Sequence, residues 1–524
     1  MRFFPRTLLL LLSALFAVAP RSLAQSNLNV TLDSGPIHGK ESGDGKVRIF
    51  LGIPYAAPPV GPLRWKPPQP VTPWKDVKET TAYGSRCMQL DLMKSVIFLD
   101  PGKSEDCLNL NVWTPKEANK LPVMVWFYGG SFAIGAGSEA RYDGDAFARR
   151  GVVLVTLNYR LGIFGFFATT ELAAESPQHA AGNYGYLDQN AALQWVKRNI
   201  AAFGGDPGNV TIFGESAGAF AVNAHMASPL SRGLFHRAIG ESGGGIGKSA
   251  VPGPTLAAKE KEDEKFAKNM LHADNLAALR AMPAADLLSK AMPKLFSHVP
   301  AFAPNIDGYF LPDSVASIFA ANKQAPVPLL AGWNADEASF MSPNHTGNYT
   351  VQNLNFTLFQ TFGMRAGEAQ KYFHATTNDE AVHAADELLA NQFMVFSDWT
   401  WMEAHANSGF PVYRYLFALP APPDDIKVGI GYAYHSDELE YVFGTLETRP
   451  GAKWRPEDRR LSEQMQSYWV NFAKSGNPNG EGLPAWPNYD AKDAWQYIVL
   501  DNSISVRPDT RRDLYAFLQK AWKQ

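Results

Sequence analysis

Cysteine is scarce in this sequence, which has only Cys87 and Cys107 among its 524 residues. So low a content excludes a disulfide-rich scaffold, and no group of histidines and cysteines has the spacing of a zinc site. We therefore expect no bound metal. An even number of cysteines in an exported chain favours one disulfide, whereas two buried free thiols are the alternative if the chain stays in a reducing compartment.

Net charge is also low, and this narrows the choice of partners. The 48 lysines and arginines nearly balance the 51 acidic residues, giving a formal charge of −3. This balance lacks the positive surface that nucleic acid or an anionic membrane would require. Fixed-period repeats, low-complexity tracts and long charged runs are missing too. We predict that residues 25–524 form a single domain, whose oligomeric state the sequence leaves open.

The N-terminus has the pattern of a secretory signal peptide. Two arginines lie within the first six residues, residues 8–18 form an apolar stretch, and Ser22 and Ala24 are the small residues of a cleavage site. The apolar stretch is shorter than the roughly 20 residues that a spanning helix needs. We predict cleavage near Ala24 and a secreted or periplasmic protein with no stable membrane anchor; an uncleaved anchor is the alternative.

Short apolar runs alternate with longer helical patterns along the rest of the chain. Runs typical of buried strands occur at residues 123–128, 152–157, 210–213, 327–331 and 412–417. This alternation is typical of an α/β fold with a mostly parallel sheet covered by helices on both faces. Between the second and third runs, apolar residues from 187 to 203 recur at helical spacing. Residues 257–320 also have a helical pattern, and we expect helices inserted over the carboxyl edge of the sheet.

The strongest local signal is the motif GESAG at residues 214–218. It follows the run 210–213 and precedes the helix-compatible stretch 219–227, so it has the strand, turn and helix order of a nucleophile elbow. The glycines are required because side chains would collide with the backbone in so strained a turn. The motif predicts Ser216 as a nucleophile at a helix N-terminus, where a developing oxyanion is favoured. An ordinary helix-capping serine is the alternative.

Three other features support this prediction. The loop YGGSF at residues 128–132 follows the apolar residues 123–127, and its backbone N–H groups, with that of Ala217, suit an oxyanion hole. The run 327–331 leads into an acidic loop that ends at Glu337, and His435 lies in a loop after the last run. The order serine, acid, histidine is that of the α/β-hydrolase fold.

Longer motifs make the predicted fold and activity more specific. They are EDCLNLN at residues 105–111, NYRLG at 158–162, GNYGYLDQ at 182–189 and FGGDP at 203–207, ahead of the serine motif. Together they resemble the type B carboxylesterases, a family that also contains the cholinesterases and the catalytically inactive neuroligin-like adhesion proteins. The resemblance covers nearly the whole mature chain and implies an α/β-hydrolase fold and carboxylic ester hydrolase activity.

The resemblance also implies roles for particular residues. Ser216 corresponds to the nucleophile, Glu337 to the acid of the triad and His435 to the general base, with Asp336 a neighbour rather than the acid. The implied reaction is two-step acyl transfer, in which an alcohol leaves first and water then hydrolyses the acyl-enzyme. It requires neither a metal nor an organic cofactor.

The same resemblance pairs Cys87 with Cys107 and places the oxyanion donors at the N–H groups of Gly130, Ser131 and Ala217. The sequence departs from the family at Ser131, where a third consecutive glycine is common. A serine still offers its N–H, but its side chain would narrow or polarise the acyl side of the site.

The substrate is expected to be a small-molecule ester with a short to medium acyl or an aryl group. A lipase and a choline-ester hydrolase are the alternatives among enzymes, and an inactive adhesion protein is the alternative from another class. Between the two cysteines Phe98 is the only aromatic residue, which argues against a choline-ester hydrolase, since aromatic faces bind such cations. The adhesion protein would lack part of the triad, and all three residues are present.

Two further sets of residues have more than one interpretation. Ser242 lies in a second matching motif, but glycines and prolines follow it where a helix would have to begin, so we expect it to support the site from nearby. Several aromatic residues either line an apolar gorge or pack in the core. They are Phe302, Phe340, Phe393, Phe396, Trp399 and Trp401.

Overall fold

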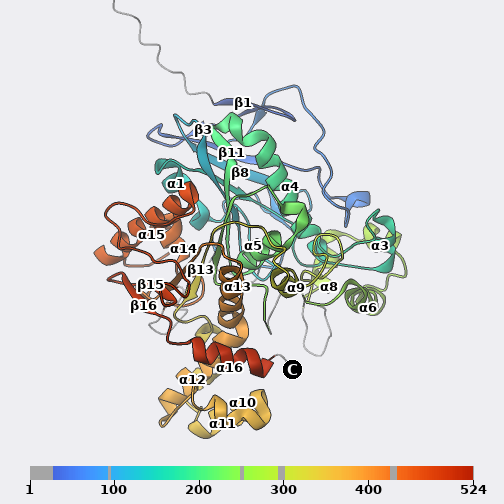
Figure 1. Ribbon diagram of the computed structural model, residues 1–524. Helices are drawn as coiled ribbons and strands as arrows, with labels where there is room; N and C mark the ends of the chain where they lie inside the picture. Colours follow the sequence, from blue (N-terminus) through green and yellow to red (C-terminus); the bar gives the residue numbers. More distant parts are fainter. Residues whose placement is uncertain (1–27, 92–95, 248–252, 293–300, 425–432, 523–524) are drawn as a thin grey trace, which may run out of the picture.

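The computed structural model describes residues 28–91, 96–247, 253–292, 301–424 and 433–522. A large mixed β-sheet crosses the molecule, and helices cover both of its faces (Figure 1). In spatial order its strands are β16 (Ser505–Pro508), β15 (Gln496–Leu500), β14 (Val412–Phe417), β13 (Leu329–Asn334), β12 (Arg237–Glu241), β11 (Gly205–Glu215), β9 (Leu121–Phe127), β10 (Val153–Leu157), β8 (Asn109–Pro115), β4 (Val47–Pro54) and β3 (Lys40–Glu41).

The centre of this sheet is parallel and its two edges are antiparallel. From β15 to β10 every neighbouring pair of strands is parallel, while β16 at one edge and β8, β4 and β3 at the other are antiparallel. All five predicted runs are strands in the parallel part, and the predicted fold class is confirmed. The sequence did not reveal β12, because this short strand begins and ends with a charged residue that the fold places next to buried neighbours.

Short strands and helices complete the fold. The small sheets are β1 (Asn29–Leu32), β2 (Gly35–His38) and β5 (Lys78–Glu79), and β6 (Arg86–Cys87) with β7 (Lys103–Ser104). The helices are α1 (Asp145–Arg149), α2 (Gly162–Gly165), α3 (Thr170–Glu175), α4 (Tyr184–Asn199), α5 (Ala217–Ala227), α6 (Leu256–Phe266), α7 (Leu276–Ala281), α8 (Ala284–Lys290), α9 (Val315–Ala320), α10 (Val351–Phe362), α11 (Ala366–Ala369), α12 (Asn378–Ala390), α13 (Phe396–Asn407), α14 (Leu439–Phe443), α15 (Pro456–Ser475) and α16 (Arg512–Trp522).

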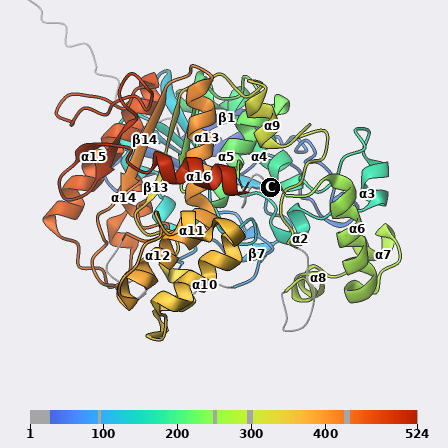
Figure 2. The same ribbon diagram turned by 60° about the horizontal axis from the view of Figure 1, so that its bottom comes forward.

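The described part of the stretch 257–320 contains helices α6 to α9, as predicted, although residues 301–314 are not helical, and its first three helices help to form a separate apolar cluster. Helices α6, α7 and α8 lie with α3 to one side of the sheet (Figures 1 and 2). Their buried side chains, such as Phe266 and Leu279, pack with Trp65, Phe164 and Phe167 in a cluster separate from the main core. These helices therefore form a lateral subdomain beside the sheet.

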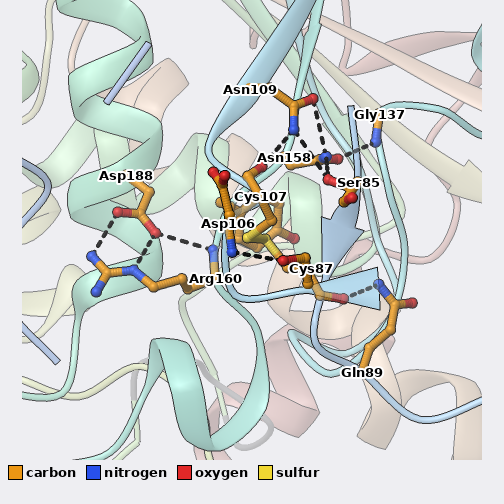
Figure 3. Close-up of a disulfide and its surroundings, with 12 residues drawn as sticks. Ser85, Cys87, Gln89, Asp106, Cys107, Asn109, Gly137, Asn158, Arg160 and Asp188 are labelled. Atoms are coloured by element: carbon orange, nitrogen blue, oxygen red, sulfur yellow. Dashed lines mark hydrogen bonds and ion pairs between the residues drawn. A yellow bond between two sulfur atoms is a disulfide. The ribbon is translucent and has the colours of Figure 1, made fainter. Parts of the chain in front are cut away.

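A disulfide joins Cys87 with Cys107 and ties the N-terminal segment to the start of β8 (Figure 3). The side chain of Gln89 donates to the Cys87 carbonyl at 3.1 Å and to the Gly135 carbonyl at 2.8 Å, and it accepts from the Gly135 N–H. Asn158 accepts from the Gly137 N–H at 2.9 Å. These contacts anchor the far end of the glycine-rich loop that follows β9.

A buried ion pair explains two of the longer motifs. The Arg160 guanidinium donates to both carboxylate oxygens of Asp188 at 2.7 Å, and the Arg160 N–H donates at 3.0 Å (Figure 3). Asp188 lies on α4 and is fully buried. Loss of either partner would leave an uncompensated buried charge, so the pair locks the loop after β10 onto α4.

Candidate active site

Ser216 lies in a sharp turn between β11 and α5. Its φ of 52° is in the left-handed region, which is strained for a residue with a side chain. A Cβ atom on Gly214 would come within 2.6 Å of the Gly218 backbone and of the Phe127 carbonyl oxygen. The Ser216 N–H donates to the Glu241 carbonyl on β12 at 2.8 Å. The neighbouring strands therefore hold this serine in its strained conformation, as the glycine motif predicts.

The loop after β9 lies directly against this serine. A Cβ atom on Gly129 would come 3.1 Å from the Ser216 Cβ, and both Gly130 and Ser131 have positive φ angles, of 102° and 55°. Within the described ranges, the N–H groups of Gly130, Ser131 and Ala217 donate no hydrogen bond to another group of the protein. The loop and the start of α5 thus offer backbone donors beside Ser216, which is what an oxyanion requires.

Glu337 and His435 form a close hydrogen-bonded pair. Glu337 lies just beyond β13, and its Oε2 is 2.6 Å from His435 Nδ1. Its other oxygen, Oε1, accepts from the Ser242 hydroxyl and from the Asn334 N–H, both at 2.6 Å. Three donors therefore satisfy a carboxylate that is only 1% exposed. Ser242 supports the site in the way its sequence context suggested.

Asp336, the neighbour of Glu337, faces a different set of atoms. Its Oδ1 accepts from the Ser339 N–H at 2.9 Å and stabilises the turn after β13. The structure thus pairs His435 with the second of the two adjacent acids.

A second carboxylate contacts the other side of the imidazole. Glu215, which immediately precedes Ser216, places its Oε1 3.2 Å from His435 Nε2 and accepts a hydrogen bond from the Ser436 hydroxyl. Burial by itself would lower the pKa of His435, but the carboxylates of Glu215 and Glu337 raise it, and the result is a pKa above the ordinary value. Sequence analysis missed this role, although the position of Glu215 beside the nucleophile was a usable signal.

Two more acids lie buried beneath this group. Burial and the charge of Glu215 raise the pKa of Glu241 to about 8, although the Trp469 indole donates to it at 2.7 Å. Burial and the surrounding carboxylates also raise the pKa of Glu438 well above its usual range. Neighbouring carboxylates cannot all ionise in so dry a space. Burial and mutual repulsion therefore favour the neutral, protonated forms of Glu241 and Glu438.

Half of the aromatic residues proposed for a gorge, Phe396, Trp399 and Trp401, are buried in the main core. Trp399 stacks on Tyr515, and Trp401 is fully buried against Gly240. The remaining four differ in their surroundings. Phe396 packs against Trp522, Phe302 packs against Phe266, Phe393 packs against His435, and the side chain of Phe340 lies outside the described part of the structure.

The described part of the chain shows neither a metal site nor a membrane-spanning helix. In the described ranges no group of three or more histidine, cysteine or acidic side chains is arranged to hold a metal ion. The helices that the structure describes include none that is both long and apolar enough to cross a membrane. The disulfide fits a protein outside the cytosol.

The sheet and the elbow that carries Ser216 define the class of protein, an α/β-hydrolase. The carboxylesterase family profile matches residues 26–518, so the chain belongs to the carboxylesterase family. It is a serine-dependent carboxylic ester hydrolase.

Known relatives match over most of their length. The chain is 38% identical to the acylcarnitine hydrolase of Mus musculus over 518 aligned residues. The aligned region covers 93% of this chain and 88% of that protein. It is 37% identical over 536 residues to liver carboxylesterase 1 of Oryctolagus cuniculus, covering 93% and 92%. Among solved structures it is similar to a thermophilic PNB esterase, with a TM-score of 0.79 and 35% identity over 94% of this chain and 100% of that one.

Proposed function

We propose that this enzyme hydrolyses esters through an acyl-enzyme on Ser216. His435 takes the proton of Ser216 as the hydroxyl attacks the ester carbonyl, and then gives it to the departing alcohol. Water, activated by the same imidazole, hydrolyses the acyl-enzyme and regenerates the serine. Glu337 orients the imidazole and stabilises its charged form, because its carboxylate lies 2.6 Å from Nδ1.

The oxyanion of each tetrahedral intermediate would be bound by backbone amides. The N–H groups of Gly130, Ser131 and Ala217 are the donors, since they lie beside the serine and have no other acceptor within the described ranges. Removing one such donor typically costs roughly 2.7 to 4 kcal/mol in the transition state. The observation that supports the whole proposal is the Glu337–His435 pair, whose imidazole also lies 3.2 Å from Glu215, the residue before Ser216.

Short to medium acyl esters and aryl esters are the proposed substrates. Similar proteins carry names such as acylcarnitine hydrolase, medium-chain fatty acyl-CoA hydrolase and cocaine esterase, so acylcarnitines and acyl thioesters belong in the test panel. A choline-ester hydrolase is disfavoured by one contact. The ring of Phe98, the only aromatic side chain of the disulfide loop, already faces the Arg86 guanidinium at 4.4 Å.

Export is proposed as well. Residues 1–24 have the pattern of a cleaved signal peptide, and a disulfide is stable in the oxidising periplasm or outside the cell. N-terminal sequencing of the protein recovered from a secreting host should find a start just after Ala24, whereas an intact N-terminus would contradict cleavage.

The test is hydrolysis of p-nitrophenyl acetate, butyrate, octanoate and palmitate, and of an acylcarnitine and an acyl-CoA thioester, by the mature chain and by Ser216→Ala. We expect turnover of the shorter esters and a loss of up to about 10⁶-fold in the variant, as for other serine hydrolases. Ser242→Ala is the matched control, because this second serine should be supporting rather than attacking. A folded wild-type protein that is inert on the whole panel, or a Ser216→Ala variant with full activity, would contradict the proposal.

A further inference from the structure

The residue after the general base has a backbone conformation that its side chain makes unfavourable. Ser436 follows His435 in the loop before α14, and its φ of 71° lies in the left-handed region. A residue with a side chain is strained there, whereas glycine is not. Such strain persists only where the surrounding structure enforces it, and it concentrates at functional sites. Ser436 is therefore a candidate for a role that requires its hydroxyl group.

The Ser436 hydroxyl binds the second carboxylate of the site. It donates to Glu215 Oε1, and the same oxygen lies 3.2 Å from His435 Nε2. The other ring nitrogen, Nδ1, faces Glu337 at 2.6 Å, so Nε2 is the nitrogen that exchanges a proton with Ser216. The Ser436 hydroxyl and Nε2 thus share one oxygen of a carboxylate that is only 2% exposed.

This shared oxygen competes for a proton that the reaction needs. Once the imidazole is protonated, its Nε2–H must pass to the oxygen of the departing alcohol, which leaves the imidazole neutral. A bare carboxylate 3.2 Å away would hold the same proton in an ion pair. A hydroxyl that donates to this carboxylate stabilises its charge and makes it a weaker acceptor. Glu215 has little room to turn away, because a Cβ atom on Gly129 would come within 2.6 Å of its Oε2.

We propose that Ser436 is a positioning residue for ester hydrolysis, which acts through Glu215 and keeps the proton on His435 Nε2 available to the departing alcohol. This inference rests on the proposed function, because it takes His435 as the acid that protonates that alcohol. The effect of the hydroxyl is indirect. It sets how strongly Glu215 competes for one proton.

The same hydrogen bond affects the pH dependence of the enzyme. Burial raises the pKa of Glu215, while His435 and the Ser436 hydroxyl oppose that rise. Without the hydroxyl, Glu215 is more basic and pairs more strongly with the imidazolium, so the pKa of His435 rises. Because the base must be neutral to accept the serine proton, the acid limb of kcat/KM then moves to higher pH. The other charged or titratable groups around this pair are Glu337, Glu241, Glu438, Arg141, Tyr142 and Tyr159.

The experiment compares Ser436→Ala and Ser436→Gly with the mature wild-type enzyme on ethyl butyrate and p-nitrophenyl butyrate. Both esters have the same acyl group, but ethoxide must be protonated as it leaves, whereas p-nitrophenolate is stable without a proton. The measured quantity is kcat/KM, which reports the acylation step, as a function of pH. Ser339→Ala is the matched control, because the Ser339 hydroxyl has no hydrogen-bond partner among the described residues. Ser216→Ala is measured in parallel.

In both Ser436 variants we expect kcat/KM for ethyl butyrate to fall about tenfold relative to that for p-nitrophenyl butyrate, roughly the factor that one charge-assisted hydrogen bond supplies. The acid limb should move to higher pH by about half a unit. Ser436→Gly should melt at a higher temperature than Ser436→Ala, because only glycine relieves the strain at a φ of 71°. Equal catalytic defects in two variants of unequal stability would assign the defect to the hydroxyl.

A double variant tests whether Ser436 acts through Glu215. In a Glu215→Gln background the competing carboxylate is gone, so Ser436→Ala should change neither the ester ratio nor the acid limb any further. An effect of the same size in that background would overturn the inference. A wild-type ester ratio and acid limb in the Ser436 variants would also overturn it, as would an equal loss on both esters.

Failure of this inference is separate from failure of the proposed function. In the first case Ser216→Ala is still inactive, whereas in the second Ser216→Ala keeps the wild-type rate. Ser436→Gly keeps the test available if Ser436→Ala does not fold.

Discussion

Replacing Glu337 by glutamine should inactivate the enzyme through the tautomer of His435. In the native site the Glu337 Oε1 accepts from the Asn334 N–H at 2.6 Å, and the Oε2 faces His435 Nδ1 at 2.6 Å. A backbone N–H can only donate, so the carbonyl oxygen of the new amide must occupy the Oε1 position. The amide NH₂ is then forced to face His435.

An NH₂ group at that position donates to Nδ1 and moves the ring proton to Nε2. The imidazole can then no longer accept the proton of Ser216. An equivalent substitution of the acid in a serine protease triad lowers kcat about 10⁴-fold for this reason. We expect a similar loss here, which corresponds to about 5.4 kcal/mol in the activation barrier.

The assay is the initial rate of p-nitrophenyl butyrate hydrolysis near neutral pH, with thermal unfolding to verify that the variant is folded. Asp336→Asn is the matched control. Its amide oxygen can still accept from the Ser339 N–H, so it should keep most of the wild-type activity. A folded Glu337→Gln enzyme within tenfold of wild type, or an Asp336→Asn enzyme that is equally impaired, would refute this reasoning.

Three other predictions concern the second carboxylate at His435, the disulfide and a buried aspartate on α13. Glu215→Gln removes a carboxylate 3.2 Å from His435 Nε2, so the pKa of His435 should fall and the acid limb of kcat/KM should move to lower pH; an unchanged limb would contradict the role given to this acid. Replacing Cys87 and Cys107 by alanine opens a bridge of sequence separation 20, and denaturant unfolding should show a loss of about 3 kcal/mol; equal stability would mean that the unfolded loop is already constrained. Burial raises the pKa of Asp398 well above its usual range, so the folded protein keeps a proton that the unfolded chain releases above about pH 4. Its contribution to stability therefore falls as pH rises, and Asp398→Asn should raise the melting temperature more at pH 8 than at pH 5; a gain that is the same at both pH values would show that this carboxyl is ionised in the folded state.

Most of the site residues could be predicted because they lie in local motifs: Ser216, Ser131 and Glu337 follow strands closely, and His435 lies in a loop further beyond β14. The glycines around Ser216 and before Ser131 are requirements of tight turns, and such requirements are visible in the sequence. No such local requirement marks the buried acids. Glu241 and Glu438 lie far apart in the chain, and neither is followed by a motif that indicates a buried carboxyl group.

The surroundings of the aromatic residues also could not be predicted from the sequence. Phe393, Phe396 and Trp399 are close in sequence and similar in chemistry, so periodicity alone cannot tell which of them packs in the core and which contacts His435. Phe393 lies in a π-helical segment, η9 (Asn391–Val395), and packs against His435, whereas Phe396 and Trp399 on α13 pack against Trp522 and Tyr515. The helix propensities of these residues do not predict a π-helical segment.

By itself the sequence determined the α/β fold and the order of serine, acid and histidine, because strand and helix periods and turn glycines are local properties of the chain. The family rested on a resemblance carried by the longer motifs. Only the tertiary structure decided that Glu215 touches the second nitrogen of His435, which other carboxyl groups are buried near the site and which aromatic ring lies against the imidazole. These features depend on burial and on distances between residues of different strands, and both arise only when the sheet is assembled.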